Sequence, residues 1–161
     1  MTNYRDIPEL YEYMQLVDNA GMDGRKKVCN LQKKLIKLVR HIFETEDITV
    51  DTGQLARYMG LQKYFSFKLF PWEKFVFTLH NCTYDFDGFP RFPDLIIFVA
   101  RGAGKNGYLA FEDFCLISPY NTIQEYDIDI CAMSEEQAKT SFKDIYKILE
   151  NPIHKSHKKI L

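Results

Sequence analysis

An apolar run that leads directly into a glycine-rich loop limits the folds open to this chain more than any other feature. Residues 94–100, Asp-Leu-Ile-Ile-Phe-Val-Ala, have the length and β-branched content of a strand that is buried on both faces. The loop Arg101-Gly102-Ala103-Gly104-Lys105-Asn106-Gly107 follows at once, and residues 108–117 then have a helical pattern. A strand, a loop and a helix in this order predict one unit of a parallel α/β sheet.

A second strand and a second helix are predicted downstream. Residues 126–133 alternate apolar and polar side chains, which is typical of a strand. Ser134 and Gln137 form a capping box, so a helix is expected to begin there. Its inward face is expected to carry Ala138, Phe142, Ile145 and Leu149. Together these elements predict an α/β fold in which N-terminal helices precede the start of a parallel sheet, with the sheet incomplete.

Two helices are predicted before residue 50, where the chain changes character. Asp6 is expected to cap the first, with Leu10, Met14 and Val17 on its inward face and Gly21 and Gly24 at its stop. The second helix, residues 26–45, has apolar residues spaced three and four apart, which predicts a core-facing stripe. That stripe is Val28, Leu31, Leu35, Leu38 and Ile42. We interpret residues 1–50 as an N-terminal helical region and 51–161 as the first part of a second domain.

The other faces of the second helix are basic. They carry Lys26, Lys27, Lys33, Lys34, Lys37 and Arg40, with no acid between them. A solvated face of an amphipathic helix explains this pattern. A surface that contacts the DNA phosphate backbone is the alternative, because six cations on one helix produce a local positive field.

The segment between the two regions combines short helices with turns. Asp51 is expected to cap a helix that runs to about Met59, and Pro71 is expected to start another that runs to about Leu79. Residues 65–70 are aromatic and extended, and residues 85–90 have the Asp, Gly and Pro content of a turn.

The glycine-rich loop has the chemistry of a phosphate site. Backbone N–H groups at the start of a helix, together with the positive end of the helix dipole, attract an anion. Lys105 would reach the β- and γ-phosphates of a nucleotide as a point charge. The full phosphate-loop pattern has Gly in place of Val99 and Ser or Thr in place of Asn106. An ordinary Gly-Lys turn is the alternative, and the flanking strand and helix favour the phosphate site.

At this point the chain resembles the large terminase subunit of tailed bacteriophages, the ATP-driven DNA-packaging motor. Residues 67–73, Phe-Lys-Leu-Phe-Pro-Trp-Glu, resemble its adenine motif, and residues 95–107 resemble its deviant Walker A loop, which opens with Arg. Residues 128–132 resemble its second strand, and residues 134–139, Ser-Glu-Glu-Gln-Ala-Lys, the start of the next helix. The resemblance covers about residues 55–150 and implies a P-loop NTPase sheet.

The resemblance also implies roles for individual residues. Lys105 and Arg101 would be catalytic, with Arg101 binding or sensing the γ-phosphate of ATP. Gly102, Ala103, Gly104, Lys105 and Asn106 would hold the phosphates, Asn106 would be the Mg²⁺ ligand, and Trp72 with Glu73 would hold the adenine. Glu73 stands where the family usually has Gln, and a carboxylate accepts hydrogen bonds but cannot donate one. A helix-start acid is the alternative role of Glu73, and a core aromatic is that of Trp72.

The family's remaining machinery has no counterpart in these residues. Phosphoryl transfer needs an acid that holds Mg²⁺ and a residue that orients water, and Asp127 and Asp129 lie within a predicted strand, not at its end. We therefore expect an N-terminal fragment of a terminase large subunit that binds ATP and hydrolyses little of it alone. The family's Walker B strand and nuclease domain would be absent. A non-enzymatic DNA-binding or assembly module that uses helix 26–45 is the alternative.

The same resemblance implies the setting. The partners would be double-stranded phage DNA, the terminase small subunit and the portal protein, and the location would be the bacterial host cytoplasm, transiently at the procapsid. Composition agrees with a globular chain, with 46% hydrophobic and 27% charged residues and a net charge of -1. No run approaches the roughly 18 apolar residues of a membrane span. Cys29, Cys82, Cys115 and Cys131 show no metal-site spacing.

Overall fold

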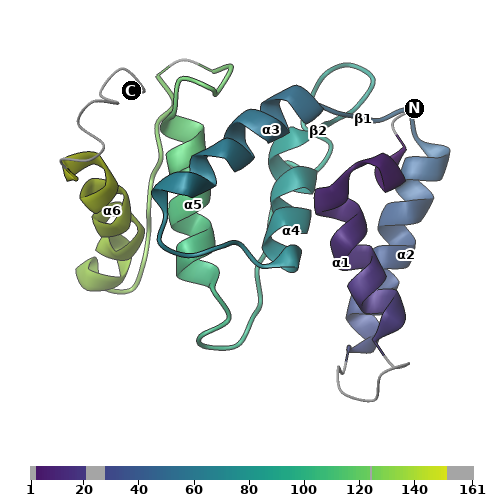
Figure 1. Cartoon of the computed structure of the whole chain (residues 1–161), viewed down its shortest axis with the longest axis horizontal. Helices are drawn as coiled ribbons and strands as arrows, with labels where there is room; N and C mark the ends of the chain where they lie inside the picture. The colour runs from purple at the N-terminus through teal and green to yellow at the C-terminus, as the bar shows by residue number, and fades with distance from the viewer. Residues whose placement is uncertain (1–2, 21–27, 124, 152–161) are drawn as a thin grey trace. The chain divides into compact units, whose positions relative to one another are not determined.

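The computed structural model describes residues 3–20, 28–123 and 125–151. The chain is mostly helical, with one small antiparallel sheet, and its elements are labelled in Figure 1. The helices are η1 (Tyr4–Asp6), α1 (Pro8–Asn19), α2 (Asn30–Thr45), α3 (Thr52–Gly60), η2 (Leu61–Tyr64), α4 (Pro71–Cys82), α5 (Lys105–Ile117) and α6 (Glu135–Glu150). The strands are β1 (Thr49–Val50) and β2 (Thr83–Tyr84), in which Thr49 faces Tyr84.

The chain forms two compact units, each built from two segments. The first combines the segment that ends at Thr52 with Phe70–Ile96, and the second combines Gly53–Leu69 with the segment that starts at Ile97. Each unit is described by itself below. Within the described residues, none of the helices has both the length and the apolar character needed to cross a membrane.

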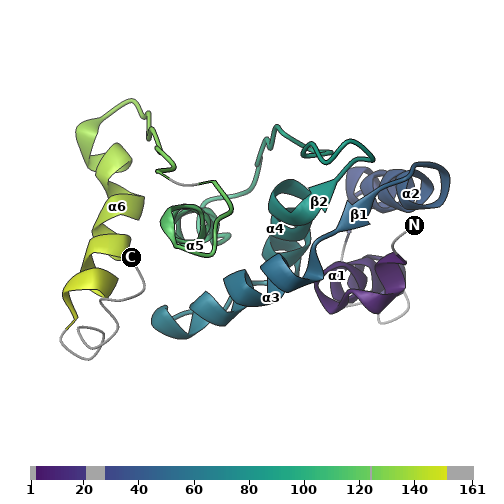
Figure 2. The ribbon, with the colours of Figure 1, turned by 90° about the horizontal axis from the view of Figure 1, so that it is seen from above.

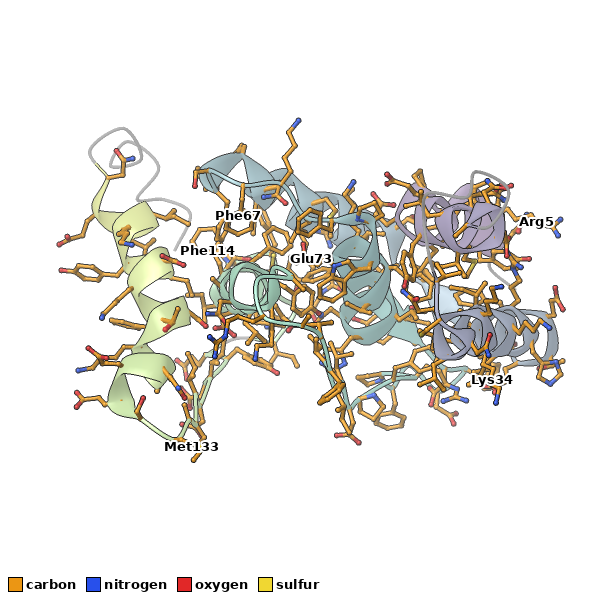
Figure 3. All side chains as sticks on the ribbon, turned by 90° about the horizontal axis from the view of Figure 1, so that it is seen from below. Arg5, Lys34, Phe67, Glu73, Phe114 and Met133 are labelled. Atoms are coloured by element: carbon orange, nitrogen blue, oxygen red, sulfur yellow. The ribbon has the colours of Figure 1, made fainter. Side chains whose placement is uncertain are left out.

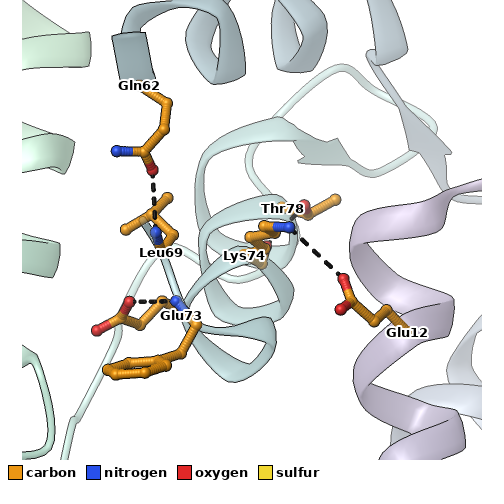
Figure 4. A network of polar contacts seen from close by, with 7 residues as sticks. Glu12, Gln62, Leu69, Glu73, Lys74 and Thr78 are labelled. Atoms are coloured by element: carbon orange, nitrogen blue, oxygen red, sulfur yellow. Dashed lines mark hydrogen bonds and ion pairs between the residues drawn. The ribbon is translucent and has the colours of Figure 1, made fainter. Parts of the chain in front are cut away.

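The first unit is built around α1, which contacts both α4 and α2 (Figure 1). The rings of Tyr13 and Phe75 pack with their centroids 5.0 Å apart, and Lys74 Nζ lies 3.5 Å from Glu12 Oε2 (Figure 4). Arg40 of α2 pairs with Asp18 of α1. Aromatic pairs of this kind stabilise a core beyond the area that they bury.

The expected stripe of α2 is not the buried face. The structure buries Ile36, Val39, Ile42 and Phe43. Leu31, Leu35 and Leu38 are exposed, at 74%, 40% and 54% of their surface. The helix has two overlapping apolar faces, and its contact with α1 selects the one that carries Ile36. The expected stripe was therefore wrong except at Ile42, and Lys26 and Lys27 lie outside the described residues.

The cap of the first helix lies one residue later than expected. Asp6 ends η1, and Ile7 occupies the cap position without a side-chain hydrogen bond. Leu10, Met14 and Val17 are buried as predicted, and Gly21 and Gly24 lie outside the described residues. The predicted starts at Thr52, after Asp51, and at Pro71 are confirmed.

The second unit packs an aromatic cluster against α5. The Phe65 ring lies 5.6 Å from both Phe111 and Phe114, measured between centroids, and Tyr58 O accepts a weak hydrogen bond from Cys115 Sγ. Seen from above, α5 is viewed along its axis beside α6, which it contacts (Figure 2). Ile145 of α6 is buried as predicted, whereas Phe142 is 58% exposed and stacks on Tyr146.

The two expected strands of the parallel sheet are not formed. Residues 94–100 and 126–133 have no strand assignment, and the side chains of Ile96 and Phe98 are 93% and 101% exposed. A strand is held by hydrogen bonds to a neighbouring strand, and these residues pair with none in the described part of the chain. The prediction that Ile96 and Phe98 are buried was therefore wrong.

The core of the first unit yields a matched stability prediction. Phe75 is fully buried, whereas Phe86 of the same unit is 81% exposed. Phe75→Ala is expected to lower the free energy of unfolding by about 3–5 kcal/mol, because it leaves a cavity. Phe86→Ala is expected to change it by less than about 0.5 kcal/mol. Urea unfolding followed by Trp72 fluorescence measures both, and equal effects would contradict the described core.

Candidate functional site

The loop before α5 turns through two left-handed glycines. Gly102 has φ of 84° and Gly104 has φ of 94°, conformations that other residues adopt only at a cost in energy. The amide of Ala103 donates to Ala100 O at 3.2 Å, which closes the first turn of the loop. The second glycine ends the loop, because α5 begins at Lys105.

The start of α5 presents donors for an anion. The first N–H groups of an α-helix have no acceptor within the helix, so the amides of Lys105, Asn106 and Gly107 are directed outward from the N-terminal end of α5. The helix dipole adds a partial positive charge at the same place. Lys105 and Arg101 are both exposed, and in the described part of the chain neither has an ion-pair partner.

The loop forms one wall of a pocket of about 830 Å³. The opposite walls come from residues 130–132 and from Gln137, Thr140 and Ser141 of α6. None of the described residues that line the pocket is acidic, while Arg101 and Lys105 bring two positive charges. A pocket with two cations and several backbone amides favours an anionic ligand.

The donor set does not suit a metal ion held by the protein alone. Mg²⁺ prefers oxygen ligands with negative charge, and Asn106, the predicted ligand, offers one neutral amide oxygen at an exposed position. Among the described residues there is no group of three or more His, Cys, Asp or Glu side chains that could hold a metal. The predicted role of Asn106 as metal ligand stays a prediction.

Trp72 and Glu73 belong to the first unit, at the start of α4. Glu73 is 2% exposed, and its Oε2 accepts a hydrogen bond from the Phe70 amide at 2.7 Å (Figure 4). Burial raises the pKa of the Glu73 carboxyl, although the hydrogen bond from Phe70 opposes the shift. Glu73 therefore caps the start of its own helix, as its alternative role requires, and its role toward adenine stays a prediction.

Two features of the second unit have no motif in the sequence. The first is the α6 wall of the pocket, which adjoins the loop only because α6 packs on α5. The second is Asp113 of α5, whose pKa is raised to about 6 by burial and by the neighbouring charge of Glu112. A shifted carboxyl of this kind marks a candidate functional residue, but Asp113 does not line the loop pocket.

Comparisons with protein-family models, with curated proteins and with solved structures give no match for this chain.

The raised pKa of Asp113 predicts how stability depends on pH. Because the folded chain binds this proton more tightly than the unfolded chain, the contribution of Asp113 is greatest below its ordinary pKa of 3.8 and is lost as the pH rises through about 6. Asp113→Asn removes the titration. The unfolding free energy of the native chain, minus that of Asp113→Asn, is expected to fall between these pH values in urea titrations. A constant difference would contradict the shift.

Proposed function

We propose that the loop Arg101–Asn106 binds the phosphates of a nucleoside triphosphate, ATP in the first instance. The loop geometry carries the proposal: two left-handed glycines place the N-terminus of α5, Lys105 and Arg101 along one acid-free pocket. Backbone amides at a helix start and a lysine in the loop are the elements that phosphate loops use. Mg²⁺ would arrive with the phosphate oxygens, which supply the negative charge that the pocket lacks.

The wider proposal is that the chain is the N-terminal part of a phage terminase large subunit. It rests on the resemblance of residues 67–73 and 95–107 to the family's adenine motif and Walker A loop. In that setting the bound ATP would power packaging of double-stranded phage DNA, together with the small subunit and the portal protein. Hydrolysis by this chain alone is expected to be slight, because phosphoryl transfer needs an acid that holds Mg²⁺ and a residue that orients water, and none of the described residues that line the loop pocket is acidic.

The P-loop parallel sheet is part of the same proposal. Residues 94–100 would be a strand of that sheet once neighbouring strands pair with it. The exposure of Ile96 and Phe98 supports a strand here, because covering large apolar side chains that are exposed to water lowers the free energy. A strand at this position would end at Ala100, directly before the loop.

A titration with Mg-ATP tests the phosphate site. Lys105→Ala is expected to weaken binding at least about tenfold, since a hydrogen bond to a charged group contributes about 1.5–3 kcal/mol. Lys143→Ala is the matched control, because Lys143 is an exposed lysine of the same unit that does not line the loop pocket. Isothermal titration calorimetry measures both variants beside the native chain.

Two results would contradict these expectations, one about binding and one about hydrolysis. Equal affinity in the native chain and in Lys105→Ala would remove the loop from the binding site. Steady ATP turnover by the purified chain that disappears in Lys105→Ala would keep the site and overturn the expectation of little hydrolysis.

A DNA-binding or assembly module is the second candidate, and the surface of α2 favours it. Lys33, Lys34 and Lys37 are exposed and have no ion-pair partner among the described residues, whereas Arg40 is paired with Asp18. Cations that are free of acids can replace the counterions of the DNA backbone. Exposed apolar side chains on the same helix favour contact with a partner protein; these are Leu31, Leu35 and Leu38.

Salt dependence tests the DNA candidate. If α2 binds duplex DNA, the logarithm of the affinity falls linearly with the logarithm of salt concentration, and Lys33→Ala, Lys34→Ala and Lys37→Ala combined reduce the slope by about 3. Fluorescence anisotropy with a labelled duplex measures the slope. Lys105→Ala is the control and should leave it unchanged. A slope that the triple variant does not alter would exclude α2 as the DNA contact.

A further inference from the structure

We propose that a second pocket of the same unit holds the base of the nucleotide whose phosphates lie at the loop. This base pocket, of about 270 Å³, lies between residues 64–67 and the C-terminal half of α6. The inference rests on the proposed function, since it requires the phosphates to be bound at Arg101–Asn106. It assigns the base to residues other than Trp72 and Glu73.

Aromatic rings form one side of the base pocket. Tyr64, Phe65 and Phe67 all line it, and the Phe65 and Phe67 rings lie 5.2 Å apart between centroids at an angle of 57°. Ile148 of α6 adds an apolar surface. A flat base stacks well on such rings, and stacking of this kind is tolerant of base identity because every base has a π-face.

Polar groups lie at the opposite side. Asp144 and Lys147 of α6 line the base pocket as an ion pair, with Lys147 Nζ 3.2 Å from Asp144 Oδ1. A carboxylate only accepts hydrogen bonds, so Asp144 would accept one from an N–H group of the base, such as the amino group of adenine. The base pocket therefore combines a stacking surface with an acceptor.

The Phe67 ring lies between the base pocket and the loop pocket. A Cβ atom added at Gly107 would lie 3.1 Å from Phe67 Cζ, so this ring lies directly against the first turn of α5. Gly107 lines the loop pocket and Phe67 lines the base pocket. The two pockets are therefore neighbours separated by this packed contact, and Figure 3 labels Phe67 beside α5. A nucleotide with its phosphates at the first turn of α5 would place its base beyond the Phe67 ring.

The burial of Glu73 supports this assignment over one to Trp72 and Glu73. Glu73 is 2% exposed at the start of α4, so adenine could reach its carboxylate only if the side chains that cover it moved. The base pocket requires no such movement at Ser66, which lines it and is exposed.

The test compares Mg-ATP with inorganic tripolyphosphate, which has the phosphates and no base. The native chain is expected to bind ATP about tenfold more tightly than tripolyphosphate, because only ATP stacks in the base pocket. Ser66→Trp fills the pocket mouth and is expected to bring ATP down to the affinity of tripolyphosphate, with tripolyphosphate binding unchanged. Thr122→Trp adds the same ring at another exposed hydroxyl residue of this unit, outside both pockets, and should leave both affinities as in the native chain.

The outcomes separate this inference from the proposed function. Binding of neither ligand by the native chain overturns the phosphate site, and the base pocket with it. Equal affinities for ATP and tripolyphosphate leave the phosphate site standing and overturn the base pocket. An ATP advantage that survives in Ser66→Trp and is lost in Trp72→Phe assigns the base to Trp72, and so overturns the inference.

Discussion

The packing of aromatic rings on α5 holds the candidate site in place. Phe65 contacts both Phe111 and Phe114, and Phe67 lies against Gly107 in the first turn of the same helix. These contacts fix the helix whose N-terminus faces the loop. The direction of its free amides, and the position of Lys105, follow from that packing. A phosphate site at Arg101–Asn106 therefore depends on side chains that never touch the phosphate.

Local patterns predicted most of the helices and few of the buried faces. Pro71 and Asp51 act over a single turn, so the starts of α4 and α3 could be predicted from neighbouring residues. Whether Leu35 or Ile36 is on the buried side of α2 depends on how α2 packs against α1. A pattern within α2 alone does not contain that information. The run 94–100 shows the same limit, because an apolar segment becomes a strand only when a second strand pairs with it.

The candidate site divides in the same way. Gly102, Gly104 and Lys105 are neighbours in the sequence, so the loop and the helix start could be predicted together. Thr140 and Ser141 reach the loop pocket only through the contact of α6 with α5, and Phe67 reaches Gly107 across forty residues of chain. Asp113 has a shifted pKa because of burial, which no spacing of acids foretells. At Trp72 and Glu73 the sequence suggests a role through a resemblance. Both residues lie in the segment that resembles the family's adenine motif, whereas the structure shows Glu73 capping the start of its own helix.

Phosphate binding by the amides of the loop and of the start of α5 can be tested directly. Nitrogen-15 NMR of the labelled chain, titrated with inorganic tripolyphosphate, observes those amides. The largest shifts are expected at Gly102, Gly104, Lys105 and Asn106 and are expected to reach saturation. Shifts confined to other residues, with these four amides unchanged, would contradict phosphate binding there.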